Sequence, residues 1–442
     1  MSWKRYPEYK ESGIEWLGEM PEHWKLEPLK RTFKIINGST PKSGELSYWD
    51  GDIAWATPDD LGSLKGDTLH ITQRSITQAG YESCGTSLAP TGSLVLSTRA
   101  PIGHLALSGV SMCTNQGCRC LTFCNKDNHK FYYYQLLSAK HELKSWGQGS
   151  TFKELSRDKL SYACLVKAPV VEQNAIAAFL DRETERIDTL VTQKERQIEL
   201  LQEKRVALIS HAVTKGLNPD VKMKDSGIEW LGNVPVGWRV ERLRFNVWTN
   251  PTKAEVKNIT GDTLVSFVPM EAVCEYGGLS LDQTKPLDEL SNGYTYFRNG
   301  DVLVAKITPC FENGKGSIAE GLENGIGFGT TELHVLRPQW KIDYKYLFYL
   351  TISYAFRQIG KSYMYGAGGQ KRVPDDFIRN LRHSFPVISE QRTIASFLDC
   401  ETERIDTLIK KVQESIDKLH KYRTALISAA VTGKIDVRKE VA

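Results

Sequence analysis

Residues 179–190 read FLDRETERIDTL, and residues 397–408 read FLDCETERIDTL. Without a gap, the match continues to ALISHAVT at 207–214 and ALISAAVT at 425–432, so each position in the second copy lies 218 residues after its counterpart. Each copy must form the same supersecondary unit, because the same sequence repeated at a fixed period is the signature of a repeated structure. The chain is therefore expected to be built twice on one plan.

Both copies have the apolar spacing of a long helix. Apolar residues in the first copy fall three, four or seven positions apart, at Ile176, Leu180, Ile187, Leu190, Ile198, Leu201 and Leu208. The second copy has them at Ile394, Leu398, Ile405, Leu408, Val412, Ile416, Leu419 and Leu426. No proline or glycine interrupts either copy before Gly216 or Gly433, and this length suits a coiled coil.

The segments before the helices are also repeated, since SGIEWLGEMPEHW at 12–24 returns as SGIEWLGNVPVGW at 226–238. We predict an α+β protein with two pseudo-repeated α/β domains joined by two long antiparallel coiled-coil helices. Antiparallel pairing follows from the short connection between the first helix and the second lead-in. The predicted boundaries are domain one with its lead-in at 1–169, the first helix at 170–216, domain two with its lead-in at 217–388, and the second helix with the C-terminal tail at 389–442.

Composition fits two globular domains, because the 442 residues are 40% hydrophobic and 25% charged. The N-terminal run is polar, and no stretch approaches eighteen uninterrupted apolar residues, so we expect a cytoplasmic protein without a membrane segment. The nine cysteines are interpreted as reduced thiols. A net charge of +4 is modest for a nucleic-acid binder and would have to be concentrated on particular faces.

Within the domains, the run GSLVLST at 92–98 predicts a buried strand, and GDVLVAKITP at 300–309 stands in the same place in domain two. The run FYYYQLLSAKHELKSW at 131–146 predicts a helix, and a short amphipathic helix is expected around Pro28–Ile36. Two Gly-rich loops follow, GQGSTFKEL (147–155) and GAGGQKRVP (366–374). Aligned on their first glycine, they match Lys153 to Arg372.

These features resemble the specificity subunit of type I restriction-modification systems. The resemblance is carried by the twin lead-ins, the twin FLDxETERIDTL helices, the Glu-Gln pairs Glu172-Gln173 and Glu390-Gln391, and the G-x-G loops with a basic residue. It covers essentially the whole chain. It implies that the globular segments are target recognition domains, each reading one half of a split, asymmetric DNA site, and that the helices dock methyltransferase subunits.

The motifs of a DNA-modifying enzyme are missing from the sequence. The nearest string to an (N/D)PP(Y/F) methyltransferase loop is Asn250-Pro251-Thr252-Lys253, and no G-x-x-x-x-G-K-[ST] phosphate loop occurs. Pro58-Asp59 and Glu142-Leu143-Lys144 form a nuclease-like PD…ExK pattern, but such short strings arise by chance. No catalytic residue is predicted.

Four cysteines of domain one lie close together in the sequence, as the ligands of a metal site can. Their spacing, at Cys113, Cys118, Cys120 and Cys124, lacks the CxxC pairs of structural zinc. Cys118 and Cys120 alternate along a probable strand, so small buried side chains are the preferred interpretation, and no metal is expected.

A DNA reader needs Arg, Lys, Asn or Gln for base edges and hydroxyl or amide groups for phosphates. Residues of these types in Gly- or Pro-punctuated loops are our candidates. In domain one they are Thr40, Lys42, Ser43, Arg99, Asn115, Gln116, Gln148, Ser150, Thr151 and Lys153. In domain two they are Lys306, Thr308, Asn313, Lys315, Thr331, Gln370, Lys371 and Arg372.

The resemblance implies that the partners are double-stranded DNA, two methyltransferase subunits and the restriction subunits. It implies that S-adenosylmethionine, ATP and Mg²⁺ belong to those subunits and that this chain binds no cofactor. Two alternatives stay open on the residues alone. One is a free-standing methyltransferase or nuclease with divergent motifs, and the other is a coiled-coil adaptor that binds protein but no DNA.

Overall fold

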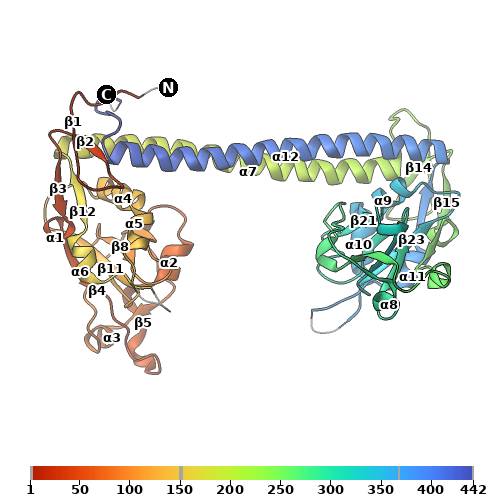
Figure 1. Cartoon of the computed structure of the whole chain (residues 1–442), viewed down its shortest axis with the longest axis horizontal. Helices are drawn as coiled ribbons and strands as arrows, with labels where there is room; N and C mark the ends of the chain where they lie inside the picture. The colour runs from red at the N-terminus through yellow and green to blue at the C-terminus, as the bar shows by residue number, and fades with distance from the viewer. Residues whose placement is uncertain (1–2, 149–152, 367–368, 441–442) are drawn as a thin grey trace. The chain divides into compact units, whose positions relative to one another are not determined.

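The structure is a computed structural model that describes residues 3–148, 153–366 and 369–440 (Figure 1). The chain forms two compact units, one of Met1–Lys194 with Glu414–Ala442 and the other of Glu195–Gln413. The division falls within the two long helices, α7 (Val170–Lys215) and α12 (Ile388–Val431). Each unit therefore contains one globular domain and a segment of both helices.

Within each unit the helix segments pair antiparallel (Figure 1). In the first unit, Arg423 of α12 donates from Nε and Nη2 to the two carboxylate oxygens of Asp188 on α7, at 3.0 and 3.2 Å. In the second unit, the repeat counterparts Arg205 and Asp406 form the same ion pair. One repeated sequence thus supplies both sides of the contact. The buried members of the predicted apolar stripes are Ile176, Leu180, Ile187, Ile394, Leu398, Ile405, Val412, Ile416 and Leu426.

The described part of domain one contains two larger sheets. One has the order β4 (Phe33–Asn37), β11 (Cys118–Phe123), β8 (Leu94–Ser97), β9 (Leu105–Ser108) and β6 (Thr68–Leu69). The other has the order β10 (Met112–Thr114), β5 (Trp49–Ala56) and β7 (Ser75–Ile76). β8 is buried at every position, as its continuous apolar sequence predicted.

The described part of domain two repeats the first sheet. Its order is β16 (Val247–Thr249), β23 (Leu333–Pro338), β20 (Val302–Ala305) and β21 (Gly316–Ile318). β20 is the fully buried counterpart of β8, in the place predicted for it. A second sheet has the order β18 (Thr284–Pro286), β17 (Leu264–Val268), β22 (Ile326–Gly329) and β19 (Thr295–Arg298), and it has its own apolar core.

Four two-stranded sheets also follow the repeat. They are β1 (Tyr9–Glu11) with β2 (Glu19–Pro21), β13 (Met223–Asp225) with β14 (Asn233–Pro235), β3 (Lys25–Pro28) with β12 (Cys164–Lys167), and β15 (Arg239–Arg242) with β24 (Arg382–Phe385), counted among the described residues. The shorter helices are α1 (Leu29–Thr32), α2 (Pro58–Ser63), α3 (Gln78–Glu82), α4 (His129–Ser138), α5 (Lys140–Ser145), α6 (Arg157–Tyr162), α8 (Leu287–Leu290), α9 (Tyr344–Ile352), α10 (Tyr354–Ser362) and α11 (Asp375–Asn380). The 3₁₀ turns are η1 (Leu46–Tyr48), η2 (Leu243–Phe245), η3 (Lys253–Val256), η4 (Met270–Ala272) and η5 (Glu323–Gly325). Within the ranges that the structure describes, no helix is long and apolar enough to cross a membrane.

Two local predictions need correction. The helix expected around Pro28–Ile36 is confined to α1, and β4 begins at Phe33, because Phe33 and Ile35 alternate into the core while the strand pairs with β11. The helix expected at 131–146 is broken into α4 and α5 at Ala139. The equivalent break in domain two falls at Ser353, whose hydroxyl caps α10.

The repeated FLDxET stretch is where each domain docks on its helix. In domain one, the Tyr134 hydroxyl donates to Asp181 Oδ1 at 2.7 Å and lies 3.1 Å from the Thr184 hydroxyl, while Lys130 lies 3.2 Å from the same carboxylate. Burial raises the pKa of Tyr134, so the hydroxyl stays a donor. The same contacts join α9 to α12 through Lys345, Tyr349, Asp399 and Thr402.

The Gln of each Glu-Gln pair ties its long helix to the start of a domain helix. The Gln173 side chain accepts from the Asn128 backbone N–H at 2.8 Å, and Asn128 caps α4. Gln391 accepts from the Asp343 N–H at 2.8 Å, and Asp343 caps α9. The pair therefore fixes the angle at which each long helix leaves its domain.

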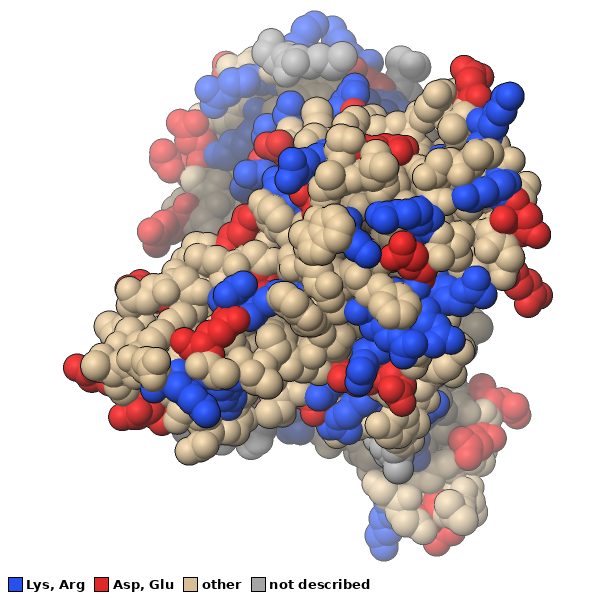
Figure 2. Space-filling view, turned by 90° about the vertical axis from the view of Figure 1, so that its right-hand side faces the viewer, with Lys and Arg blue, Asp and Glu red and all other residues tan. Residues whose placement is uncertain are grey.

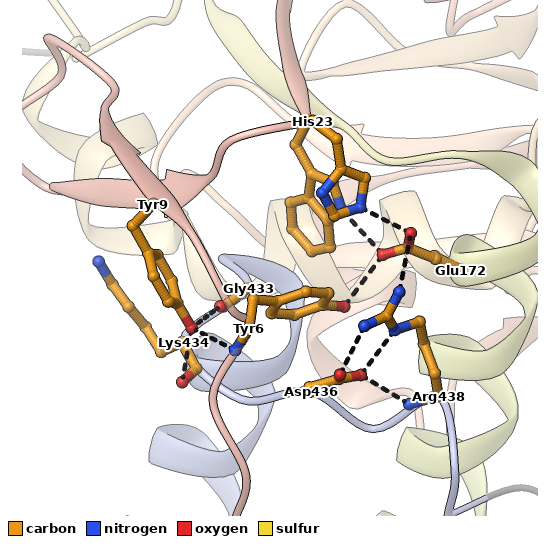
Figure 3. Close-up of polar contacts among 9 residues, drawn as sticks. Tyr6, Tyr9, His23, Glu172, Gly433, Lys434, Asp436 and Arg438 are labelled. Atoms are coloured by element: carbon orange, nitrogen blue, oxygen red, sulfur yellow. Dashed lines mark hydrogen bonds and ion pairs between the residues drawn. The ribbon is translucent and has the colours of Figure 1, made fainter.

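The Glu of the first pair anchors the N-terminal lead-in (Figure 3). Glu172 accepts from the Trp24 indole at 2.9 Å and from the Tyr6 hydroxyl at 3.1 Å, and it lies 2.7 Å from His23 Nε2. Arg438 of the C-terminal tail lies 3.9 Å from the same carboxylate. The two ends of the chain thus meet at the start of α7.

Candidate nucleic-acid interface

The backbone brings the predicted recognition loops of domain one together. The Ser39 N–H donates to the Thr114 carbonyl at 2.9 Å, and the Thr98 N–H donates to the Gly117 carbonyl at 2.8 Å. The Leu155 N–H donates in turn to the Thr98 carbonyl at 2.8 Å. Four loops that are far apart in the sequence therefore share one end of the β4-β11-β8 sheet.

Several candidate side chains of these loops have partners within the same group of loops. Arg99 Nε lies 2.9 Å from Glu154, the Thr40 hydroxyl donates to Gln116, and Asn115 accepts from the Gly117 N–H at 2.9 Å. The exposed candidates in this group are Lys42, Ser43, Arg99, Gln116, Gln148 and Lys153. Ser150 and Thr151 lie outside the described residues. The loops that carry the described candidates of domain one are therefore joined at this end of the sheet.

In domain two, the Gly-rich loop lies against the end of β20. The Thr308 hydroxyl donates to the Gly369 carbonyl at 2.8 Å and accepts from the Lys371 N–H at 3.0 Å. Arg372 forms a bidentate pair with Glu332, with Nη2 to Oε1 at 2.7 Å and Nε to Oε2 at 3.0 Å. The other candidates in these segments are Lys306, Thr331 and Gln370.

Two candidates of domain two, Asn313 and Lys315, contact a different loop. Asn313 donates to Glu275 at 2.9 Å, and the Lys315 ammonium donates to the Met270 carbonyl at 3.3 Å. Both side chains hold the loop that contains Met270 and Glu275. Residue type alone could not separate them from the others, because the difference lies in which loop each side chain faces.

The sequence match of Lys153 to Arg372 is wrong by one residue. Glu154 makes backbone bridges to both sides of its loop in domain one, and Arg372 makes the equivalent bridges in domain two. Arg372 therefore corresponds to Glu154, and Lys371 corresponds to Lys153. Matching the two loops on their first glycine gives the wrong pairs, because the register of a hairpin is set by backbone pairing and not by the positions of its glycines.

In each domain an ion pair holds the hairpin against the sheet, but the positions of the arginine and the glutamate are exchanged between the two domains. In domain one the arginine, Arg99, follows the strand and the carboxylate, Glu154, lies on the hairpin. In domain two the arginine, Arg372, lies on the hairpin and Glu332 lies beside the strand. Hydrogen bonds from Arg372 lower the pKa of Glu332. Each guanidinium has five N–H donors, and its carboxylate partner does not use all of them.

Sequence reasoning missed several residues of these clusters. Arg119 of β11 donates to the Leu155 carbonyl at 2.6 Å and lies 3.3 Å from Glu154, and burial lowers its pKa. Tyr365 on the second hairpin is 67% exposed. The available signal was Arg119 itself, a charge between buried Cys118 and Cys120 in an otherwise apolar strand.

Three cysteines of domain one are packing residues, while Cys124 is exposed. Cys113, Cys118 and Cys120 are buried, and burial raises the pKa of Cys113 to about 11 and that of Cys120 to about 12. A raised pKa disfavours the thiolate that a metal requires. Among the described residues, no group of His, Cys, Asp and Glu is arranged to hold a metal ion.

On one face of the second unit, positive charge does not form a continuous field. Figure 2 shows a face of the second unit on which Lys and Arg side chains gather in small groups with Asp and Glu between them. Exposed arginines on this domain include Arg242 and Arg382, which are opposite one another in the β15-β24 pair. Any DNA contact therefore depends on local groups of side chains rather than on net charge.

Comparison with known sequences gives one consistent result. Residues 21–200 match the family model described as the type I restriction modification DNA specificity domain. The chain is 40% identical over 178 residues to the EcoAI specificity subunit of Escherichia coli, which is 40% of this chain and 29% of that protein. It is 25% identical over 446 residues to the MjaIX specificity subunit of Methanocaldococcus jannaschii, which is 98% of this chain and 97% of that protein.

Solved structures agree on the fold. The chain is similar to one from a structure of a type I R-M system, with a TM-score of 0.69, 15% identity, and coverage of 93% of this chain and 98% of that one. The HsdS subunit of Thermoanaerobacter tengcongensis follows, with a TM-score of 0.55, 15% identity, and coverage of 94% and 98%.

The fold is that of the solved type I restriction-modification structures, and residues 21–200 match the type I restriction modification DNA specificity domain. Over nearly its whole length the chain is similar to a protein named as a type I specificity subunit.

Proposed function

We propose that this chain reads a bipartite, asymmetric site in double-stranded DNA, with one half recognised by each domain. The observation that carries the proposal is a shared framework with unlike loops. The strand orders β4-β11-β8-β9 and β16-β23-β20-β21 correspond, yet the hairpin ion pairs have opposite polarity. Different donors and acceptors on one backbone are what two different base sequences require.

The contact residues that we propose are the clustered candidates. In domain one they are Thr40, Lys42, Ser43, Arg99, Asn115, Gln116, Gln148 and Lys153. In domain two they are Lys306, Thr308, Thr331, Gln370, Lys371 and Arg372. Arginine and glutamine at these positions suit base edges, and lysine and hydroxyl groups suit phosphates.

We further propose that the helices dock two methyltransferase subunits and that the restriction subunits join this complex in the cytoplasm. Exposed apolar side chains on the long helices support a protein partner, since Leu200 is 49% exposed and Leu408 is 41% exposed. S-adenosylmethionine, ATP and Mg²⁺ would be bound by those subunits.

Two assays on the purified chain, alone and with its methyltransferase subunits, test the proposal. The complex should bind duplex DNA with strong salt dependence, and methyl transfer should require the added subunits. Methyl transfer by the isolated chain would instead support a free-standing enzyme. Failure of the assembled complex to bind any duplex would support a protein adaptor.

A further inference from the structure

Domain one has a basic groove apart from its recognition loops. The groove has a volume of about 400 Å³ and lies between α5 and α12. Lys140, His141 and Lys144 of α5 form one wall, and Arg423 of α12 belongs to the other. All four side chains are in the first compact unit.

The two lysines on the α5 wall, Lys140 and Lys144, have no carboxylate partner among the described residues. Arg423 is paired with Asp188, and His141 lies 3.5 Å from Glu142. In the part of the chain that the structure describes, no ion pair joins Lys140 or Lys144 to a carboxylate. Burial and the neighbouring Lys144 lower the pKa of Lys140. An external anion would relieve this repulsion.

The groove adjoins the recognition cluster. A methyl group placed at Gly103 would lie 3.0 Å from Lys140 Cγ, so the loop that begins at Arg99 packs directly on the α5 lysine. At the other end of α5, a methyl group at Gly147 would lie 3.5 Å from Lys153 Cβ. The hairpin of the cluster therefore begins where α5 ends.

His104, at the end of the Arg99 loop, has its pKa lowered by burial and then by Lys140 and Lys144, so its imidazole stays neutral beside the two lysines. The positive charge of the groove therefore comes from Lys140 and Lys144, and it lies beside the loops that carry the candidate base-reading side chains. This is the arrangement that a DNA backbone requires, because phosphate contacts position the protein while base contacts specify the sequence.

We propose that this groove holds the sugar-phosphate backbone of DNA next to the bases read by domain one, with Lys140 and Lys144 as phosphate contacts. The inference rests on the proposed function and extends it, because neither lysine belongs to the recognition loops. The lysines act without regard to base sequence, and they anchor the half-site of domain one.

The described residues of domain two differ at the equivalent helix. Its helix α10 faces a groove whose other wall on α7 includes Glu199 and Glu203. The basic groups of α10 are engaged within the domain, since Arg357 donates to the Glu312 carbonyl at 2.9 Å and Lys361 pairs with the Glu312 carboxylate at 2.8 Å. Helix α10 therefore offers no un-neutralised lysine equivalent to Lys140 or Lys144 of α5.

The test is the salt dependence of binding to a random-sequence duplex, measured by fluorescence anisotropy on the full chain assembled with its methyltransferase subunits. A plot of log K against log salt has a negative slope, and Lys140→Gln with Lys144→Gln should make it less steep by roughly 0.9 per lysine. Lys140→Arg with Lys144→Arg keeps both charges and should leave the slope unchanged. A control that removes two charges elsewhere, Lys25→Gln with Lys126→Gln, should also leave the slope unchanged.

Three results separate the possibilities. An unchanged slope in a folded Lys140/Lys144 variant overturns the inference while leaving the proposed function intact. An unchanged slope with weaker assembly of the methyltransferase subunits would assign the groove to a protein partner and would also overturn it. If the unmodified complex shows no salt-dependent duplex binding, the proposed function itself fails.

Discussion

Replacing Glu172 by alanine should destabilise the first unit by an amount that follows from its buried partners. Trp24 is 0% exposed and Tyr6 is 3% exposed, and both donate to the Glu172 carboxylate. Removing the acceptor leaves two buried donors unsatisfied, at about 1–3 kcal/mol each, so the expected loss is about 4 kcal/mol. The matched variant Glu390→Ala leaves one buried donor, the indole of Trp238, and should cost about 2 kcal/mol.

Urea unfolding followed by tryptophan fluorescence, analysed for two transitions, measures both losses. Both glutamates lie in the first turn of a long helix, so helix-end and cavity effects are similar in the two variants. In a Tyr6→Phe background, Glu172→Ala should cost no more than Glu390→Ala does. If Glu172→Ala costs no more than Glu390→Ala in the unmodified chain, the anchoring role of Glu172 is wrong.

Two further predictions concern the hairpins and a buried histidine. Arg99→Ala and Arg372→Ala should each weaken DNA binding by about 1–3 kcal/mol if the guanidinium contacts a base, and the losses should add because the residues lie in separate compact units. A double variant no weaker than either single variant in an anisotropy assay would contradict this. Burial lowers the pKa of His383 from 6.5 to about 4, so the unfolded chain takes up the proton first and stability should fall as pH drops through this window, by about 1.4 kcal/mol per pH unit and about 3 kcal/mol in total. His383→Gln should remove that slope in urea unfolding, and an unchanged slope would exclude His383 as its source.

The repeat in the sequence predicted the fold class well, because equivalent residues of the two copies make the same contacts. Asp181 and Asp399 each accept from a domain tyrosine, and Asp188 and Asp406 each pair with an arginine of the other helix. Residues that make such long-range contacts are kept in both copies of a duplicated sequence, so the repeat itself indicates them. The resemblance to type I specificity subunits is confirmed by the comparisons.

The details of the candidate site were harder to predict. Residue type and loop position selected Arg99 and Arg372, but not the carboxylates that hold them, because Glu154 and Glu332 are distant in sequence or off the loop. The wrong match of Lys153 to Arg372 has the same origin. Hairpin register depends on backbone pairing across the sheet, which the loop sequence does not encode by itself.

The direct test of the central claim is to exchange residues 37–168 for the same segment of a relative with a different site, and to map the methylated bases in cells that carry the partner subunits. Divided recognition predicts that one half of the methylated site changes to that of the relative while the other half is retained. A change in both halves, or in neither, would contradict the assignment of one half-site to each domain.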